Sequence, residues 1–373
     1  MNRREFLALS FAAAIAGKAA AAPANEPGEW RNKQSGMAYR RLGRTGYMIS
    51  EVVMGGNLIS PTNYEHVLMA LDHGLNYLDT APAYGRLKSE NGYAQVVKAR
   101  KRDSFFLNTK VSDLVTNRGD LYDTIYESLA ASEQKKWDTR VADEIARLGA
   151  FQPDYIGDYF DGQRPGMEQA VRANLMEKEY GRRIDRGKNY RQLILDSVDK
   201  SLKRLGTDYL DLLACPHAVS TAAELETHPE MFEAFDVLRK AGKVRHFSLS
   251  AHNDPAAVLD AAVRTGQYSA AMVAYNIINH RFVDASLQRA HKAGMGVIAM
   301  KVARPVHNGR NRGIVDPPER IAKANAAVPG PMKVPHKAYL FALRNPNLSA
   351  VISEMGTAEI TKDNLPLATP KPI

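Results

Sequence analysis

The sequence contains one cysteine among 373 residues, which excludes an internal disulfide framework. Cys215 lies in an apolar run, so we expect an unreactive, packed thiol. The chain also lacks a Gly-x-Gly-x-x-Gly fingerprint, a His-Glu-x-x-His signature and paired carboxylates at a metal-binding spacing, and no metal site is expected. Its net charge of +9 comes from basic residues scattered among acidic ones, without a nucleic-acid-binding motif. We therefore expect a solvated surface and no nucleic-acid partner.

No apolar run near the N-terminus is long enough to span a bilayer. Arg3 and Arg4 precede a short apolar segment, residues 7–16, and small residues follow it at the spacing of a cleavage site. This pattern resembles a twin-arginine signal, which exports folded proteins, and an ordinary secretory signal is the alternative. We predict a signal at 1–24, a linker at 25–38, recognition by the twin-arginine export machinery, and a periplasmic or extracellular location without a stable membrane anchor.

Strand-like and helix-like segments alternate through the rest of the chain. Several of the strand-like runs are apolar without alternation, as buried parallel strands are. The expected strands are Ser50–Gly55, Asn76–Thr80, Phe105–Val111, Tyr209–Pro216, Val244–Ser250, Ala271–Asn276, Gly296–Val302 and Ser349–Ser353. Eight such repeats predict an α/β fold, a closed (β/α)8 TIM barrel, as a single domain at 39–373. A hairpin is expected before it, at Tyr39–Ser50, with Gly43 and Gly46 allowing the turn.

One long interval, residues 112–189, breaks this rhythm after the third strand. It contains helical patterns at about 120–147 and 167–180 and many aromatic residues. Because it emerges where third-strand loops of a barrel reach the catalytic face, we interpret it as a lid that shapes substrate access. An exposed subunit contact is the alternative. A second irregular, Pro/Gly-rich stretch occupies 303–334.

Four chemically active residues stand at or just after the ends of apolar runs: Asp79, Tyr84, Lys110 and His217. Each alone has an ordinary explanation, as a helix cap, a turn aromatic, a solvated lysine or a core histidine. A parallel barrel, however, gathers such strand ends onto one face. The joint pattern is therefore much more specific than any one of its members.

The four side chains suit proton transfer to a carbonyl. A free phenol has a pKa of about 10 and is a poor acid at neutral pH. We expect the Lys110 ammonium to lower the pKa of Tyr84, and Asp79 to hold Lys110 in place and charged. His217 would orient the carbonyl oxygen or help to pass the proton. Tyr84 would then protonate the oxygen as hydride arrives at the carbon.

With these motifs in hand, the chain resembles the aldo-keto reductase family. The matching segments are Tyr39–Gly46, Gly74–Gly85, Leu205–Leu213, Gly242–Ser250 and Ala274–Asn276. The resemblance extends from about Tyr39 to Asn364 apart from the two irregular stretches. It implies a (β/α)8 barrel, the catalytic tetrad Asp79, Tyr84, Lys110 and His217, and reduction of aldehydes or ketones with NAD(P)H.

The resemblance also implies a cofactor site. Its expected members are Ser250, Asn253 and Asn276 at the nicotinamide amide, Lys301 where many members carry a stacking aromatic, and Glu359 and Asn364 at the adenosine. Ser250 and Asn276 could equally be strand-end caps. The pyrophosphate would lie near the loops after strands seven and eight, with assistance from Arg304 and Arg310.

Two departures from the family pattern affect the expected ligands. Glu354 and Ile360 stand where the basic residues that hold a 2′-phosphate are expected, and an acid there would repel a phosphate. We therefore expect no strong preference for NADPH. The chain ends at Ile373, so the family's C-terminal substrate loop is expected to be missing, and the 112–189 insertion to cover the site instead.

The combined prediction is an exported carbonyl reductase or alcohol dehydrogenase that acts on an aldehyde, a ketone or a sugar. Free nicotinamide nucleotides are not expected outside the cytoplasm, so the cofactor would travel tightly bound to the folded protein. The alternative is an envelope barrel that binds a sugar or another ligand, with a degenerate cofactor site and no redox turnover.

Overall fold

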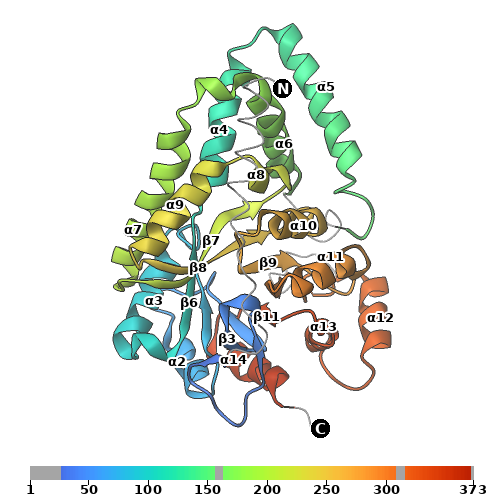
Figure 1. Ribbon diagram of the computed structural model, residues 1–373. Helices are drawn as coiled ribbons and strands as arrows, with labels where there is room; N and C mark the ends of the chain where they lie inside the picture. The colour runs from blue at the N-terminus through green and yellow to red at the C-terminus, as the bar shows by residue number, and fades with distance from the viewer. Residues whose placement is uncertain (1–26, 156–162, 308–315, 371–373) are drawn as a thin grey trace.

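A closed barrel of parallel strands forms the centre of the computed structural model, which describes residues 27–155, 163–307 and 316–370 (Figure 1). Its strands, in order around the barrel from β4, are β4 (Val52–Gly55), β5 (Tyr77–Asp79), β6 (Phe106–Lys110), β7 (Leu210–Val219), β8 (Val244–Ala251), β9 (Ala270–Ala274), β10 (Gly296–Met300) and β11 (Ala350–Ser353). Each overlaps one of the expected strands, and their parallel pairing confirms the predicted (β/α)8 barrel. Almost every residue in these strands is buried, which explains why the runs are continuously apolar.

Helices cover the outside of the barrel. They are α2 (Glu65–Asp72), α3 (Lys88–Ala99), α7 (Leu193–Leu205), α8 (Ala223–Glu226), α9 (Pro229–Lys240), α10 (Pro255–Thr265), α11 (His280–Lys292), α12 (Pro318–Ala327), α13 (Val334–Leu343) and α14 (Ala358–Asn364). Helix α10 shows how the sequence defines its ends. Asp254 caps the amide of Ala257, Pro255 occupies the first turn, and Gly266 ends the helix with a left-handed φ of 66°.

A small sheet closes the end of the barrel opposite the catalytic strand ends. β2 (Tyr39–Arg41) and β3 (Tyr47–Ser50) form the expected antiparallel hairpin, and β1 (Glu29–Trp30) pairs in parallel with β3. Gly43, in the hairpin turn, has a φ of 50°, and a Cβ there would lie 2.1 Å from the Gly296 amide nitrogen. Only glycine therefore allows this close approach to the barrel.

The described part of the expected linker, from Pro27 to Ala38, belongs to this closed end, and the linker prediction is corrected accordingly. Arg31 is 6% exposed and its guanidinium lies 2.9 Å from the buried Asp211 carboxylate. It also stacks on the Phe106 ring, with 4.4 Å between the guanidinium carbon and the ring centroid. A buried arginine paired with a buried carboxylate anchors the chain, which a free linker would not do.

The long interval after β6 is folded into three helices, α4 (Asp113–Glu127), α5 (Ala131–Leu148) and α6 (Gln163–Tyr180), followed by a 3₁₀ turn at Gly181–Arg183 and a π-helical turn at Gly187–Gln192. They gather at one end of the molecule, with α5 at its outer edge (Figure 1). Helix α4 packs against β7 and α6, and α5 packs against α6. The sequence pattern had merged α4 and α5, because it showed no break at residues 128–130.

The insertion is also tied to the loop after β8. The Tyr155 hydroxyl donates a hydrogen bond of 2.7 Å to the Asp254 carboxylate and accepts one of 3.1 Å from the Ala256 amide. Tyr155 therefore lies beside the start of α10, and Asp254, to which it donates, directly follows the expected cofactor residue Asn253. The role of the insertion as a lid or as a subunit contact stays a prediction.

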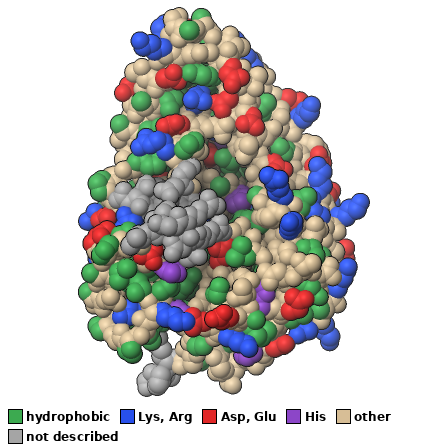
Figure 2. All heavy atoms as spheres, turned by 180° about the vertical axis from the view of Figure 1, so that it is seen from behind, with side chains coloured by type: hydrophobic (Ala, Val, Ile, Leu, Met, Phe, Trp, Pro, Cys, Tyr) green, Lys and Arg blue, Asp and Glu red, His purple; other side chains and the backbone are tan. Residues whose placement is uncertain are grey.

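The predicted signal at residues 1–24 lies outside the described residues. Within the described ranges, no helix combines the length and the hydropathy that crossing a membrane requires. On the face shown in Figure 2, the described Lys and Arg side chains are interspersed with Asp and Glu. Cys215 is buried in β7, where burial raises its pKa well above the usual value, so the thiol is protonated and packed.

Candidate active site

Asp79 and Lys110 form a buried ion pair at the ends of β5 and β6. The Lys110 ammonium donates to both Asp79 oxygens, at 2.6 Å each, and to the Thr80 carbonyl at 2.8 Å. The two residues are 0% and 1% exposed. A buried pair is costly unless its hydrogen bonds are made, and here all three ammonium protons have acceptors. Asn108, which pairs in register with Asp79, donates a further 2.7 Å bond to the carboxylate.

Tyr84 stands over this pair on the turn that follows β5. Its ring centroid lies 4.5 Å from the Lys110 ammonium nitrogen. The ring also meets the His217 imidazole edge-on, with centroids 6.0 Å apart and an interplanar angle of 81°. The structure thus brings all four residues of the expected tetrad together.

The turn that carries Tyr84 is unusual in its backbone. Gly85, Arg86 and Leu87 have consecutive left-handed φ values of 57°, 53° and 73°. For Arg86 and Leu87 such a conformation costs on the order of 1 kcal/mol each. The Leu87 amide is held by a 2.9 Å hydrogen bond to the Pro82 carbonyl, which helps to keep this turn in place. Strain maintained beside a reactive side chain is typical of functional sites.

The electrostatics of Tyr84 differ from the expectation. Burial raises its pKa well above the usual value, and the Asp79 and Glu354 carboxylates raise it further. Burial and the two carboxylates outweigh the lowering that was expected from Lys110, whose ammonium is bound by both Asp79 oxygens. The phenol is therefore protonated at rest, which is the state a proton donor requires.

His217 occupies the end of β7 and is neutral. Burial lowers its pKa well below the usual value, and the positive charge of Lys110 lowers it further, as does His252. Its Nδ1 lies 3.1 Å from the Ser112 hydroxyl oxygen. A neutral imidazole carries one N–H donor and one acceptor, so this contact bears on which nitrogen holds the proton.

Three residues of this site were not predicted from the sequence: Asn108, Ser112 and His252. Asn108 precedes Lys110 by two positions, and in a strand that spacing places both side chains on the same side of the sheet. Burial lowers the pKa of His252 to about 3, with the Lys301 and Lys110 charges as further causes. The alternation along β6 could have identified Asn108. No local pattern identifies the other two, because their neighbours come from distant strands.

Two of the expected nicotinamide residues lie beside the tetrad. Ser250, in β8, pairs in register with His217. Asn253 is 3% exposed, and its amide nitrogen donates to the Ser220 hydroxyl at 3.0 Å. Its carbonyl oxygen is buried and has no hydrogen-bond partner in the described part of the chain. A buried acceptor without a donor is unfavourable, and a carboxamide N–H would satisfy it, so this end of the site fits a nicotinamide.

Asn276 instead stabilises the turn after β9. Its side-chain oxygen accepts from the Ile278 and Asn279 amides at 2.9 and 3.1 Å, and its nitrogen donates to the Lys301 carbonyl at 3.4 Å. Lys301, directly after β10, has a left-handed φ of 57°. The contacts of Asn276 are those of the strand-end cap that was the alternative interpretation, and its part in cofactor binding stays a prediction.

The expected adenosine residues lie on and near α14. Asn364 is bound on both sides, accepting from His336 Nε2 at 3.0 Å and donating to the Ser353 hydroxyl at 2.9 Å. Glu359 is exposed in the first turn of the helix. Glu354 accepts a 2.7 Å bond from the Asn57 side chain. Arg310 lies outside the described residues.

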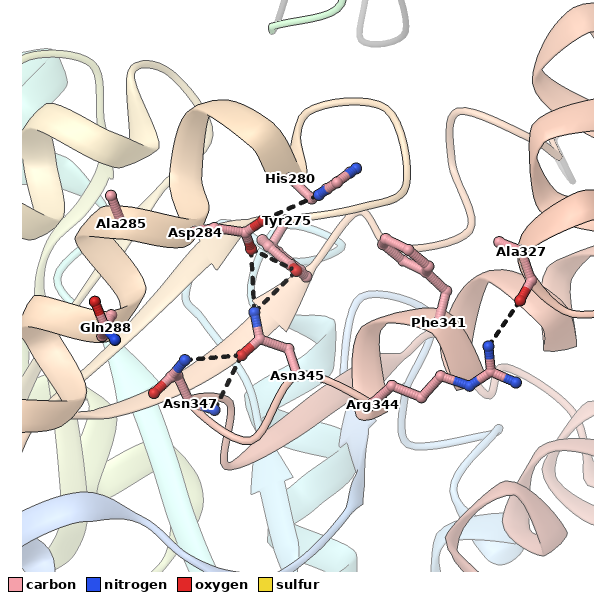
Figure 3. Close-up of a pocket in the computed structure, with 10 residues that line it drawn as sticks. All are labelled: Tyr275, His280, Asp284, Ala285, Gln288, Ala327, Phe341, Arg344, Asn345 and Asn347. Carbon is pink, nitrogen blue, oxygen red and sulfur yellow. Dashed lines mark hydrogen bonds and ion pairs between the residues drawn. The ribbon is translucent and has the colours of Figure 1, made fainter.

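A separate hollow of about 690 Å³ opens on the flank of the barrel, between α11 and α13 (Figure 3). Its polar groups bind one another: the Tyr275 hydroxyl donates to Asp284 at 2.9 Å and accepts from Asn345 at 3.0 Å. His280 lies 3.0 Å from the second Asp284 oxygen. The lining of this hollow contains no member of the tetrad, so the hollow is not the candidate site. In the described ranges, no cluster of His, Cys, Asp or Glu is arranged to hold a metal ion.

The fold and this site define a (β/α)8 barrel with a Tyr, Lys, Asp and His constellation at its catalytic end. A model of the aldo/keto reductase family matches residues 54–156 and 182–361, and the chain belongs to that family. The interval between the two matched parts falls within the insertion.

Individual relatives are distant. The chain is 27% identical over 194 residues to an aldo-keto reductase, AMT2, of Alternaria alternata. That match covers 48% of this chain but only 41% of the relative's length. Among solved structures, the holo form of aldo-keto reductase AKR11C1 from Bacillus halodurans has a TM-score of 0.59 at 19% identity, covering 90% of this chain and 92% of that one. An aldo-keto reductase from Klebsiella pneumoniae in complex with NADPH has a TM-score of 0.55 at 18% identity and covers 89% of each chain.

Proposed function

We propose that this protein is an NAD(P)-dependent oxidoreductase that interconverts a carbonyl compound and an alcohol, with an aldehyde, a ketone or a sugar as substrate. The observation that carries the proposal is the position of Tyr84, whose ring lies 4.5 Å from an ammonium held by a buried carboxylate and meets a neutral imidazole edge-on. Family membership supports the same activity. When bound, the nicotinamide supplies or takes up a hydride at the carbonyl carbon.

Side chains of the protein supply the proton and orient the carbonyl oxygen. Tyr84 retains its proton because its pKa is raised, and it donates this proton to the carbonyl oxygen during reduction. Lys110 and Asp79 hold a fixed pair of charges beneath the ring. His217, being neutral, can donate a hydrogen bond to the same oxygen and orient it.

Ser250 and the unpaired oxygen of Asn253 would hold the cofactor at its nicotinamide end. The exposed carboxylate of Glu354 stands where the family resemblance places a basic residue for the 2′-phosphate, which supports NAD(H) rather than NADP(H). The complex of the Klebsiella pneumoniae relative with NADPH supports a nicotinamide nucleotide in general. Charge repulsion from Glu354 would disfavour the additional phosphate of NADPH.

Export by the twin-arginine route forms part of this proposal, supported by Arg3 and Arg4 ahead of a short apolar segment. The nucleotide would then be carried out bound to the folded protein. Cell fractionation would compare the native chain with Arg3→Lys/Arg4→Lys. Loss of the exported form in the double variant, together with nucleotide released on denaturing the exported native protein, is expected. Equal export of both chains would contradict the twin-arginine route, and nucleotide-free exported protein would contradict a tightly bound cofactor.

The test of the activity starts with the purified full chain. Titration with NADH and with NADPH, followed by nucleotide fluorescence, is expected to show binding of both, with NADH the tighter. Glu354→Gln should reduce the difference in affinity between NADH and NADPH. Oxidation of the bound nucleotide by a panel of aldehydes, ketones and aldoses would then measure turnover. Because the pKa of Tyr84 is raised, the rate of reduction should stay level into the alkaline range rather than fall near neutral pH.

A ligand-binding barrel without redox turnover is the competing function. The acid at Glu354 and the insertion at 112–189 favour it, since both depart from the pattern of the family. Binding of a sugar without oxidation of either nucleotide by any carbonyl in the panel would establish it and overturn the proposal. The complete and closely packed tetrad argues against it.

A further inference from the structure

The hydroxyl of Ser112 is diverted from its ordinary structural role. Ser112 is the N-cap residue of α4, a position where serine usually accepts a hydrogen bond from the first amides of the helix. Here the side chain makes no capping bond. Leaving out such a cap destabilises a helix end, so the alternative contacts of this hydroxyl are informative.

Those contacts join the two reactive segments. The Ser112 oxygen accepts a 3.3 Å hydrogen bond from the Ala83 amide, next to Tyr84 in sequence. The same oxygen lies 3.1 Å from Nδ1 of His217. Ser112 therefore connects the turn that carries the proton donor with the imidazole that faces it.

The contact between Ser112 and His217 allows either direction, and donor counting favours one of them. The Ala83 amide can only donate, so the Ser112 oxygen acts as acceptor in that contact. Its single O–H then needs an acceptor, and among the described residues Nδ1 of His217 is the only one it reaches. If Nδ1 carried the proton instead, the serine O–H would have no protein partner there.

We propose, on the basis of the function put forward above, that Ser112 is a positioning residue that donates to Nδ1 of His217 and so fixes the neutral imidazole with its proton on Nε2. No described residue hydrogen-bonds to Nε2, so this N–H is available to a substrate carbonyl oxygen. The serine also ties the ring to the Tyr84 turn, so the two donors to that oxygen keep their relative position.

The proposal makes Ser112 act through His217 and not on substrate. Removing the hydroxyl would let the proton distribute between the two ring nitrogens and the ring turn away from Tyr84. The helix itself should tolerate the change, because the serine does not cap it.

The test combines histidine nitrogen NMR with kinetics on the full chain. In protein labelled with ¹⁵N-histidine, the His217 signals are assigned by their loss in His217→Gln. The native protein is expected to show a protonated Nε2 and an unprotonated Nδ1. Ser112→Ala should show averaged nitrogen shifts and a turnover lower by about tenfold or more, as for loss of a group that orients a functional histidine. Affinity for NADH and the thermal midpoint should be unchanged.

Two controls separate positioning from structure. Ser112→Thr, which keeps the hydroxyl, should retain both the nitrogen shifts and the turnover. Ser128→Ala makes the same substitution at the other end of α4, where the hydroxyl bonds only to the Ile125 carbonyl among the described residues. It should change neither the nitrogen shifts nor the turnover. If Ser112→Ala does not fold, Ser112→Cys takes its place, because a thiol is a weak donor of similar size.

The outcomes are distinguishable from failure of the proposed function. If no carbonyl is reduced, that function fails, while the nitrogen shifts of His217 still test the bond from Ser112. A proton on Nδ1 in the native protein would overturn the inference. So would Ser112→Ala with unaltered nitrogen shifts, or with altered shifts and full turnover.

Discussion

The catalytic end of the barrel and the insertion after β6 both depend on buried charges, but they use them differently. At the barrel end, one ammonium and one carboxylate are fixed by the ends of adjacent strands, and Tyr84 lies over them. In the insertion, the Glu177 carboxylate forms ion pairs with Arg118 at 2.7 Å and Arg186 at 2.6 Å, and it lies 3.3 Å from the His228 imidazole. The barrel pair is rigid because the strand register places it. The Glu177 cluster instead holds separate helices together, and its loss should loosen them without touching the chemistry.

The largest effect is expected for Lys110→Met. Turnover should fall by at least about 100-fold, because the charge pair beneath Tyr84 is lost. The free energy of unfolding should also fall by roughly 3–5 kcal/mol, since Asp79 is left as an unpaired buried charge. Denaturant unfolding measures the change in the free energy of unfolding, and steady-state kinetics measures the change in turnover.

The double variant Asp79→Asn/Lys110→Met distinguishes these effects. It removes both charges, so most of the stability should return while turnover stays low. A double variant with restored turnover would show that the pair serves only the fold.

An intermediate effect is expected for Glu177→Gln in the insertion. Removing this charge leaves Arg118 partly unpaired and should cost roughly 1–3 kcal/mol, seen as faster amide hydrogen exchange in α4 and α6. Turnover with a small aldehyde should stay within about threefold, because no Glu177 contact reaches the tetrad. Glu179→Gln is the matched control, since Glu179 makes an exposed pair with Arg140 and should contribute under about 1 kcal/mol. If Glu177→Gln lost as much turnover as Lys110→Met, the claim that the Glu177 cluster serves packing and not catalysis would be contradicted.

The smallest effect is an acid-dependent loosening of the insertion. Burial alone would raise the pKa of Glu177, but His228 and Arg118 outweigh it and hold the pKa at about 2. Because this value is below the usual one near 4.5, the carboxylate contributes stability above about pH 4.5, and that contribution is lost as the pH falls toward 2. Arg186 and Glu230 also face the cluster, and Arg186 stays charged throughout this range. The protection factors of the α6 amides, which correct for the slower intrinsic exchange at low pH, should therefore fall below pH 4.5 in the native chain and fall less in Glu177→Gln. An equal fall in both chains would assign the loosening to other groups.

The sequence predicted the barrel end well for a physical reason. Strand ends in a parallel barrel meet on one face, so Asp79, Lys110 and His217 could be placed together without knowing any contact. The same reasoning failed where pairing depends on distant segments. Ser112 was taken only as the start of the insertion, and its bond to His217 crosses 105 positions of sequence. The pKa direction of Tyr84 was missed because the balance between burial, the ammonium and two carboxylates depends on distances.

The insertion was predictable only as helical and aromatic. Its cluster draws on Arg118, Glu177, Arg186 and His228, which belong to four different segments. No periodicity within one helix indicates which of its charged residues turns inward toward another. The packing of residues 27–38 on the closed end of the barrel was missed for a similar reason. The buried Arg31–Asp211 pair joins residues 180 positions apart, and the sequence around Arg31 looks like a polar linker.

Turnover of Tyr84→Phe against Tyr126→Phe tests the central claim most directly. Both variants remove one hydroxyl; Tyr126 lies in α4, and its hydroxyl donates to Asp138 at 2.8 Å on the surface. The account predicts that Tyr84→Phe loses roughly 10²- to 10⁴-fold in turnover with nucleotide affinity unchanged, while Tyr126→Phe keeps both. Equal turnover of Tyr84→Phe and the native protein would contradict it, because Tyr84 would then not be the proton donor.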